Sequence, residues 1–167
     1  MNLKAILEAL LFVTNKPLHL EKLKKLLSQW SLKEIKQALA ELKNSYQSPD
    51  RGIELVEVAG GYRLQTKPDF RSYILTLKQT SPFRLSRSAL ETLSIIAYRQ
   101  PITRREIETI KGVDVSGTLK MLLRLNLIKI AGRKKGSTAL IYATTSHFLE
   151  VFGLKNLSEL PQLTDFS

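Results

Sequence analysis

Residues 5–26 read AILEALLFVTNKPLHLEKLKKL, and residues 89–110 read ALETLSIIAYRQPITRREIETI. Each stretch contains an apolar helix-forming segment, a break around a proline, and a second segment with apolar residues at helical spacing. From their prolines onward the two stretches align without a gap, so that Leu18 matches Ile102. A repeat of this length predicts that the chain contains the same folded unit twice.

The residues that follow the first stretch predict a third helix and a hairpin. Ser31 and Glu34 form a capping-box pattern that opens the helix. Two β-forming segments on either side of Gly60 and Gly61 then predict a β-hairpin with a primed turn.

The second half repeats this order of elements. Ser88 and Thr103 are predicted to cap its first two helices, and a third helix is expected over residues 116–125. The segments around the loop 132–136 predict a second hairpin. Because an isolated hairpin is not stable in water, each hairpin must pack on the helices that precede it.

Three helices closed by a two-stranded ribbon form a winged helix, a relative of the helix-turn-helix. The expected fold class is therefore mainly α with small β-hairpins (α+β), arranged as two tandem winged-helix domains. The N-terminal domain is expected at residues 1–78 and the C-terminal domain at residues 86–153, with a linker at residues 79–85. Residues 154–167 follow as a C-terminal tail.

The composition bounds the class of protein. The chain has no cysteine, which excludes disulfides, thiol nucleophiles and thiolate metal ligands. The apolar run at residues 5–13 is interrupted by Glu8 and is too short to span a bilayer. It also lacks the basic leader and the cleavage site of a signal peptide. We therefore expect a cytoplasmic protein with no membrane partner.

Catalytic chemistry finds little support in the sequence. His19 and His147 are the only histidines, and neither lies in a nucleophile or metal-binding pattern. Most carboxylates neighbour lysines or arginines on predicted helices, as solvated ion pairs do. The loop 132–137 lacks the Gly-Lys-Ser/Thr ending of a phosphate-binding loop. The sequence thus predicts no enzyme, no cofactor and no metal site.

A net charge of +11, spread over both halves, favours polyanions and makes DNA binding an alternative function. Both predicted third helices carry mixed charges, and neither has the cluster of arginine, asparagine or glutamine that reads base edges. Only the tip of the second wing, Arg133, Lys134 and Lys135, concentrates basic residues. Nonspecific phosphate contact and a solvated hairpin tip both remain open for these three residues.

Three sequence blocks contain residues that the hydrophobic spacing of a winged helix does not by itself explain. They are residues 52–64 (GIELVEVAGGYRL), residues 85–113 and residues 148–154 (FLEVFGL). These blocks resemble the bacterial segregation and condensation protein B family, and the likeness runs from about residue 3 to 163. The second wing is shorter than is usual in that family, and Ala143 stands where the family commonly has glycine.

The resemblance implies an accessory subunit that is not an enzyme. Proteins of this family form homodimers, mainly through the N-terminal winged helix. They bind the kleisin subunit, segregation and condensation protein A, which bridges the heads of a structural-maintenance-of-chromosomes (SMC) ATPase. The expected role is chromosome condensation and segregation on the nucleoid in the cytoplasm. The alternative is a winged-helix transcriptional regulator that binds DNA.

Leu10, Leu11 and Phe12 are the candidates for the dimer interface. They make the first helix apolar over most of its circumference, which is more than the core of one small domain needs. The alternative is that Leu11 or Phe12 packs under the wing of its own domain.

Tyr98, Arg99, Leu154 and Leu157 are the candidates for binding the kleisin, as a helix laid in a groove. Tyr98 and Arg99 end the first helix of the second copy, and the two leucines begin the regularly spaced apolar residues of the tail. Structural packing alone also explains each of these residues taken singly.

Overall fold

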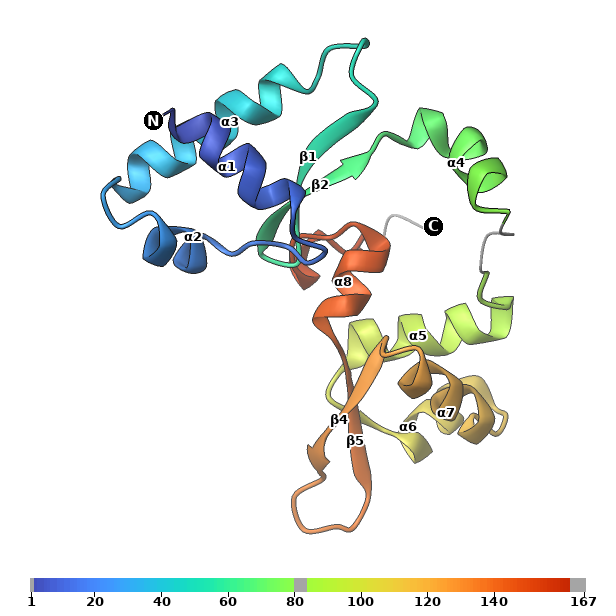
Figure 1. The fold of residues 1–167 in the computed structure, drawn as a ribbon. Coiled ribbons are helices and arrows are strands. Elements are labelled where there is room, and N and C mark those ends of the chain that lie inside the picture. Colours follow the sequence, from blue (N-terminus) through green and yellow to red (C-terminus); the bar gives the residue numbers. More distant parts are fainter. Residues whose placement is uncertain (1, 80–83, 163–167) are drawn as a thin grey trace. The chain divides into compact units, whose positions relative to one another are not determined.

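The computed structural model describes residues 2–79 and 84–162. Most of the predicted linker therefore lies outside the described residues. Two compact units are present (Figure 1). The first falls within Met1–Pro82 together with Leu154–Glu159, and the second within Phe83–Gly153 together with Leu160–Ser167.

The first unit contains three helices, a hairpin and a fourth helix. The bounds are α1 (Leu3–Phe12), α2 (Leu20–Leu26), α3 (Leu32–Ser45), β1 (Ile53–Val58), β2 (Gly61–Thr66), the 3-10 turn η1 (Pro68–Phe70), α4 (Arg71–Lys78) and, from the end of the chain, η2 (Leu157–Glu159). Apolar side chains from α1, α2 and α3 form the core, where Leu7, Leu23 and Ile35 are fully buried. The hairpin covers this core with Leu55 of β1.

The second unit has the same order of elements. Its bounds are α5 (Arg87–Arg99), β3 (Ile102–Thr103), α6 (Arg104–Lys111), α7 (Ser116–Arg124), β4 (Ile128–Arg133), β5 (Leu140–Thr144) and α8 (Ser146–Phe152). The three strands form one antiparallel sheet in the order β3-β5-β4. Ile96, Ile107 and Leu122, one from each of the first three helices, are fully buried. The α+β class and the two tandem winged helices predicted from the repeat are confirmed.

A backbone pairing at matching positions shows how closely the two copies correspond. In the first unit, Leu18 and Tyr62 exchange two backbone hydrogen bonds of 2.8 and 2.9 Å. In the second unit, Ile102 pairs with Tyr142. Leu18 and Ile102 are the residues that align in the sequence, and both immediately follow the proline. Each wing is therefore held by the segment that connects the first two helices of its own unit.

The capping predictions are right at two helices and wrong at one. Ser31 and Thr103 each form the complete capping box at the start of α3 and α6. Ser88, however, lies inside α5, and the cap is Ser86, whose hydroxyl accepts a hydrogen bond from the backbone N–H of Ala89. Ser88 and Glu91 have the spacing of a capping box, but Ser86 caps the helix through its hydroxyl, with an alanine three residues on.

The primed turn of the first hairpin is one residue earlier than predicted. Ala59 and Gly60 have φ angles of 49° and 72°, which are the two positive values that a type I′ turn requires. Gly61 instead begins β2 and pairs with Val58. Its lack of a side chain serves another purpose, because a β-carbon there would lie 3.0 Å from the carbonyl carbon and oxygen of Leu18.

We expect Gly61→Ala to destabilise the first unit by about 1–3 kcal/mol, because the added methyl group collides with backbone that is held in the Leu18–Tyr62 pairing. The matched control is Gly117→Ala in α7, where the added β-carbon meets nothing within 4 Å. That change is expected to stabilise by about 0.5–1 kcal/mol through helix propensity. Urea unfolding followed by circular dichroism measures both, and two variants of equal stability would contradict the steric explanation.

Candidate protein-binding groove

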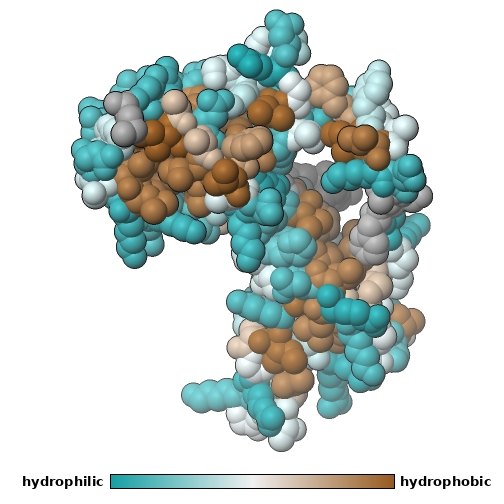
Figure 2. Space-filling view, in the orientation of Figure 1, coloured by the Kyte–Doolittle hydropathy of each residue, from teal (hydrophilic) through white to brown (hydrophobic). Residues whose placement is uncertain are grey.

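An apolar groove of about 590 Å³ lies on the second unit. Helices α5, α6 and α8 line it together with Leu160 and Pro161. Its apolar walls include Leu90, Ile95, Ile110, Phe148 and Phe152. The space-filling view shows hydrophobic residues at the surface of this unit (Figure 2). A groove of this size and composition is suited to an apolar partner segment.

The groove exists because α5 is apolar on two faces. Ile96 is fully buried in the core of the unit, whereas Leu90 and Ile95 line the groove. Leu90 is 41% exposed, and Ile110 of α6 is 55% exposed. Contiguous apolar surface of this kind marks an interaction site more often than solitary exposed residues do.

Helix α8 supplies an aromatic wall. The rings of Phe148 and Phe152 lie 4.8 Å apart, centroid to centroid, in a tilted arrangement. Phe148 is buried and Phe152 is exposed, so the pair joins the core to the groove. Aromatic side chains packed against each other keep their orientation at low entropic cost, which suits a preformed binding surface.

A second apolar groove, of about 400 Å³, adjoins the first. The two share Leu90 and Phe152, and His147 lines the second one. The apolar surface therefore continues on both sides of the two shared residues. Leu90 is the residue of α5 at the centre of this surface.

The four residues predicted to bind the kleisin are divided between the two units. Tyr98 and Arg99 line the groove at the end of α5. Leu154 and Leu157 belong to the first unit, where the Leu154 carbonyl accepts a hydrogen bond of 2.9 Å from the N–H of Ala59 in the hairpin turn. The kleisin contact itself stays a prediction for both pairs.

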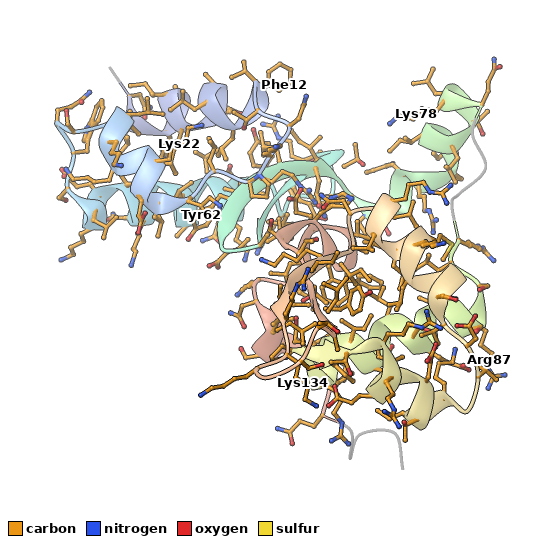
Figure 3. All side chains as sticks on the ribbon, turned by 90° about the horizontal axis from the view of Figure 1, so that it is seen from below. Phe12, Lys22, Tyr62, Lys78, Arg87 and Lys134 are labelled. Atoms are coloured by element: carbon orange, nitrogen blue, oxygen red, sulfur yellow. The ribbon has the colours of Figure 1, made fainter. Side chains whose placement is uncertain are left out.

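The residues predicted for the dimer interface also differ in exposure. Leu11 is 1% exposed in the core of the first unit, so its prediction as a dimer contact is wrong: it packs within its own unit. Leu10 is half-buried against the same core. Phe12, at the C-terminal end of α1, is 77% exposed (Figure 3). Phe12 therefore remains the principal candidate, with Leu10 beside it.

Phe12 lies at the edge of a groove of about 540 Å³ in the first unit. Ala5 and Ala9 of α1 form one side of this groove, and Ile53 and Tyr46 form part of the other. Burial, together with the hydrogen bond that the Tyr46 hydroxyl donates to the carboxylate of Glu8, raises the pKa of Tyr46 to about 12.

The basic tip of the second wing is partly neutralised. The Lys134 ammonium lies 2.6 Å from a carboxylate oxygen of Glu106 on α6. Arg133 and Lys135 are exposed. The Lys134 contact, followed by the hydrogen bonds that Glu106 accepts from Thr103, holds the pKa of Glu106 at about 2. Glu106 thus serves both as half of a capping box and as an anchor for the wing.

We expect Glu106→Gln to reduce the acid sensitivity of the second unit. The pKa of Glu106 in the folded state is below its ordinary value of 4.5. Its ionised form therefore stabilises the folded state above about pH 4.5, and this contribution disappears as the pH falls towards about 2. Urea unfolding across this window is expected to show a smaller loss of stability in Glu106→Gln than in the wild type. Glu91→Gln on α5 is the control, and identical pH profiles for wild type and Glu106→Gln would contradict the expectation.

The start of α7 carries negative charge where a DNA-reading helix would meet phosphate. Asp114 accepts hydrogen bonds from the side chain and backbone of Ser116, and Arg104 lies 3.0 Å from it. The Ser116 contacts, with help from Arg104, lower the pKa of Asp114 to about 2. Because Asp114 is paired with Arg104, this position adds no net attraction for DNA phosphate.

The two histidines belong to different units. His19 precedes α2 and its Nδ1 atom lies 3.1 Å from the carbonyl oxygen of Gly60, at the tip of the first hairpin. No three His, Cys, Asp or Glu residues come together as a metal site within residues 2–79 and 84–162. In the same part of the chain, no helix has the length and apolarity needed to cross a membrane.

Comparison with known proteins matches residues 5–163 to the family described as segregation and condensation complex subunit ScpB. Segregation and condensation protein B of Syntrophotalea carbinolica is 45% identical over 168 residues, which cover 100% of this chain and 85% of the relative. The protein of the same name from Moorella thermoacetica is 46% identical, over 98% of this chain and 84% of the relative.

Solved structures give similar matches in sequence. ScpB from Mycobacterium tuberculosis is 34% identical, over 91% of this chain and 95% of that one, with a TM-score of 0.43. A structure described as a dimer of the ScpB N-terminal domain complexed with ScpA peptide is 37% identical, over 44% of this chain and 91% of that one, with a TM-score of 0.42.

Proposed function

The chain belongs to the family of segregation and condensation complex subunit ScpB, and we propose that it is a non-enzymatic accessory subunit of an SMC complex. In this role it forms a homodimer and binds the kleisin, segregation and condensation protein A. The family match over residues 5–163 confirms the resemblance read from the sequence. The complex would act in chromosome condensation and segregation, on the nucleoid in the cytoplasm.

The apolar groove of the second unit is the observation that supports kleisin binding by this unit. Leu90 and Ile110 are exposed on its walls although their burial would be favourable. An amphipathic helix of the kleisin would cover these side chains with its apolar face. Arg99 at the end of α5 is exposed and is suited to meet acidic residues on the polar side of such a helix.

The first unit supplies the second part of the proposal, the homodimer. A protruding phenylalanine beside a groove on the same surface suits a two-fold interface, because each copy inserts its Phe12 into the groove of the other. Val13, which follows α1, is also exposed and would be covered in the same contact. Aromatic anchors in pockets carry most of the energy of many interfaces.

Size-exclusion chromatography with light scattering tests both parts in one experiment. The chain alone is expected to elute with the mass of a dimer at micromolar concentration. With the kleisin added, the mass is expected to rise by at least one kleisin per dimer. A monomer that shows no interaction with its cognate kleisin would sink the proposal. A footprint on a defined DNA sequence would instead support the transcriptional regulator.

A further inference from the structure

The groove of the second unit already contains a segment of the chain itself. Leu160 and Pro161 line it together with residues of α5, α6 and α8. The Tyr98 hydroxyl donates a hydrogen bond of 2.6 Å to the carbonyl oxygen of Pro161, which lies 63 residues further along the chain. This contact uses one of the few polar groups on an apolar wall.

The segment contacts the groove through one backbone carbonyl and through side chains, as a bound peptide without regular secondary structure does. Leu160 is half-buried against the groove, and Pro161 and Gln162 have no regular secondary structure. Pro161 has no backbone N–H to satisfy, so its carbonyl oxygen is its only backbone hydrogen-bonding group, and Tyr98 binds it. The apolar contacts of Leu160 and Pro161 and the Tyr98 hydrogen bond occupy only part of the groove. A helix that makes apolar contacts along the whole groove can therefore displace the segment.

We propose that Leu160 and Pro161 form a strap that occupies part of the groove and competes with the kleisin for it. This inference rests on the proposed function, because it takes the groove to be the kleisin site. Two segments cannot fill the same space, so the kleisin binds only the fraction of molecules whose strap has left. The apparent dissociation constant is raised by the inverse of that fraction.

Thiol labelling tests whether the strap docks in the full chain. The protein has no cysteine of its own, so Leu160→Cys and the control Leu157→Cys each provide a single reactive thiol. Leu157 lies in the same terminal segment and is more exposed, outside the groove. Each labelling rate is divided by that of the same variant in denaturant. The thiol of Leu160→Cys is expected to react at least about threefold more slowly than that of Leu157→Cys, and equal corrected rates would overturn the strap.

Titration of the kleisin tests the competition. Leu160→Ser is expected to bind the kleisin about three- to tenfold more tightly than the wild type, since the strap of this variant vacates the groove more readily. Val113→Ser, an apolar-to-serine change on the exposed turn between α6 and α7, is expected to leave the affinity unchanged. Kleisin at saturation is also expected to accelerate labelling of the Leu160→Cys variant.

The outcomes separate failure of the strap from failure of the proposed function. If the thiol of Leu160→Cys is protected but its labelling does not respond to bound kleisin, and Leu160→Ser gains no affinity, the competition is overturned. Absence of kleisin binding by the wild-type chain contradicts the proposed function, and the competition with it. The labelling contrast in the free protein decides in that case whether the strap docks at all.

Discussion

Replacing Leu90 by glutamate is expected to weaken kleisin binding by at least about 100-fold. Leu90 lines both apolar grooves of the second unit, so a partner helix in either groove would cover it. A carboxylate there would lose its water without gaining a partner, which is costly in an apolar interface. Leucine and glutamate have similar helix propensity, so α5 is expected to remain intact.

Isothermal titration calorimetry with the kleisin measures this loss. Val113→Glu is the matched control, because it places the same charge on an exposed apolar position of the second unit away from the apolar groove. Its affinity is expected to equal that of the wild type. If Leu90→Glu binds as tightly as Val113→Glu, the kleisin does not use this groove.

Replacing Phe12 by glutamate is expected to convert the homodimer to a monomer at micromolar concentration. Loss of a central aromatic anchor costs about 2–4 kcal/mol, which corresponds to a rise of about 30- to 1,000-fold in the dissociation constant of the dimer. Phe12 makes little contact with its own unit, so the fold is expected to survive the change.

Sedimentation equilibrium of the full chain measures the dimer constant directly. Leu32→Glu is the control: Leu32 is exposed in the first turn of α3, where an acidic residue is favourable. That variant is expected to remain dimeric. A dimeric Phe12→Glu would place the interface on another surface of the molecule.

The internal repeat made the fold predictable, because its matched positions correspond to matched contacts. The alignment of Leu18 with Ile102 anticipates their equivalent pairings with Tyr62 and Tyr142. Capping boxes were predictable for a similar reason, since both partners lie three residues apart. Signals of this kind are local or repeated, and they can be read directly along the chain.

The candidate site was less predictable, because its contacts join residues that are distant in sequence. The Lys134–Glu106 ion pair spans 28 residues, and no pattern in either segment indicates it. The Tyr98–Pro161 hydrogen bond spans 63 residues and uses a backbone carbonyl, which leaves no trace in residue type. Leu11 shows a related limit: in a helix that is apolar nearly all round, periodicity does not tell which leucine faces the core.

The pairing of each wing with the connector of its own unit also bears on how the two copies have diverged. The Leu18–Tyr62 and Ile102–Tyr142 pairings each join the connector after the first helix of a unit to a strand of its wing. A wing therefore cannot detach without breaking this backbone pairing. Each copy should then open as a whole, and the amide protons of Leu18 and Tyr62 should exchange only through global unfolding of the first unit. Because this pairing uses backbone groups, surface residues of either copy can be substituted without breaking it. The two copies can therefore acquire different binding surfaces while each keeps its fold.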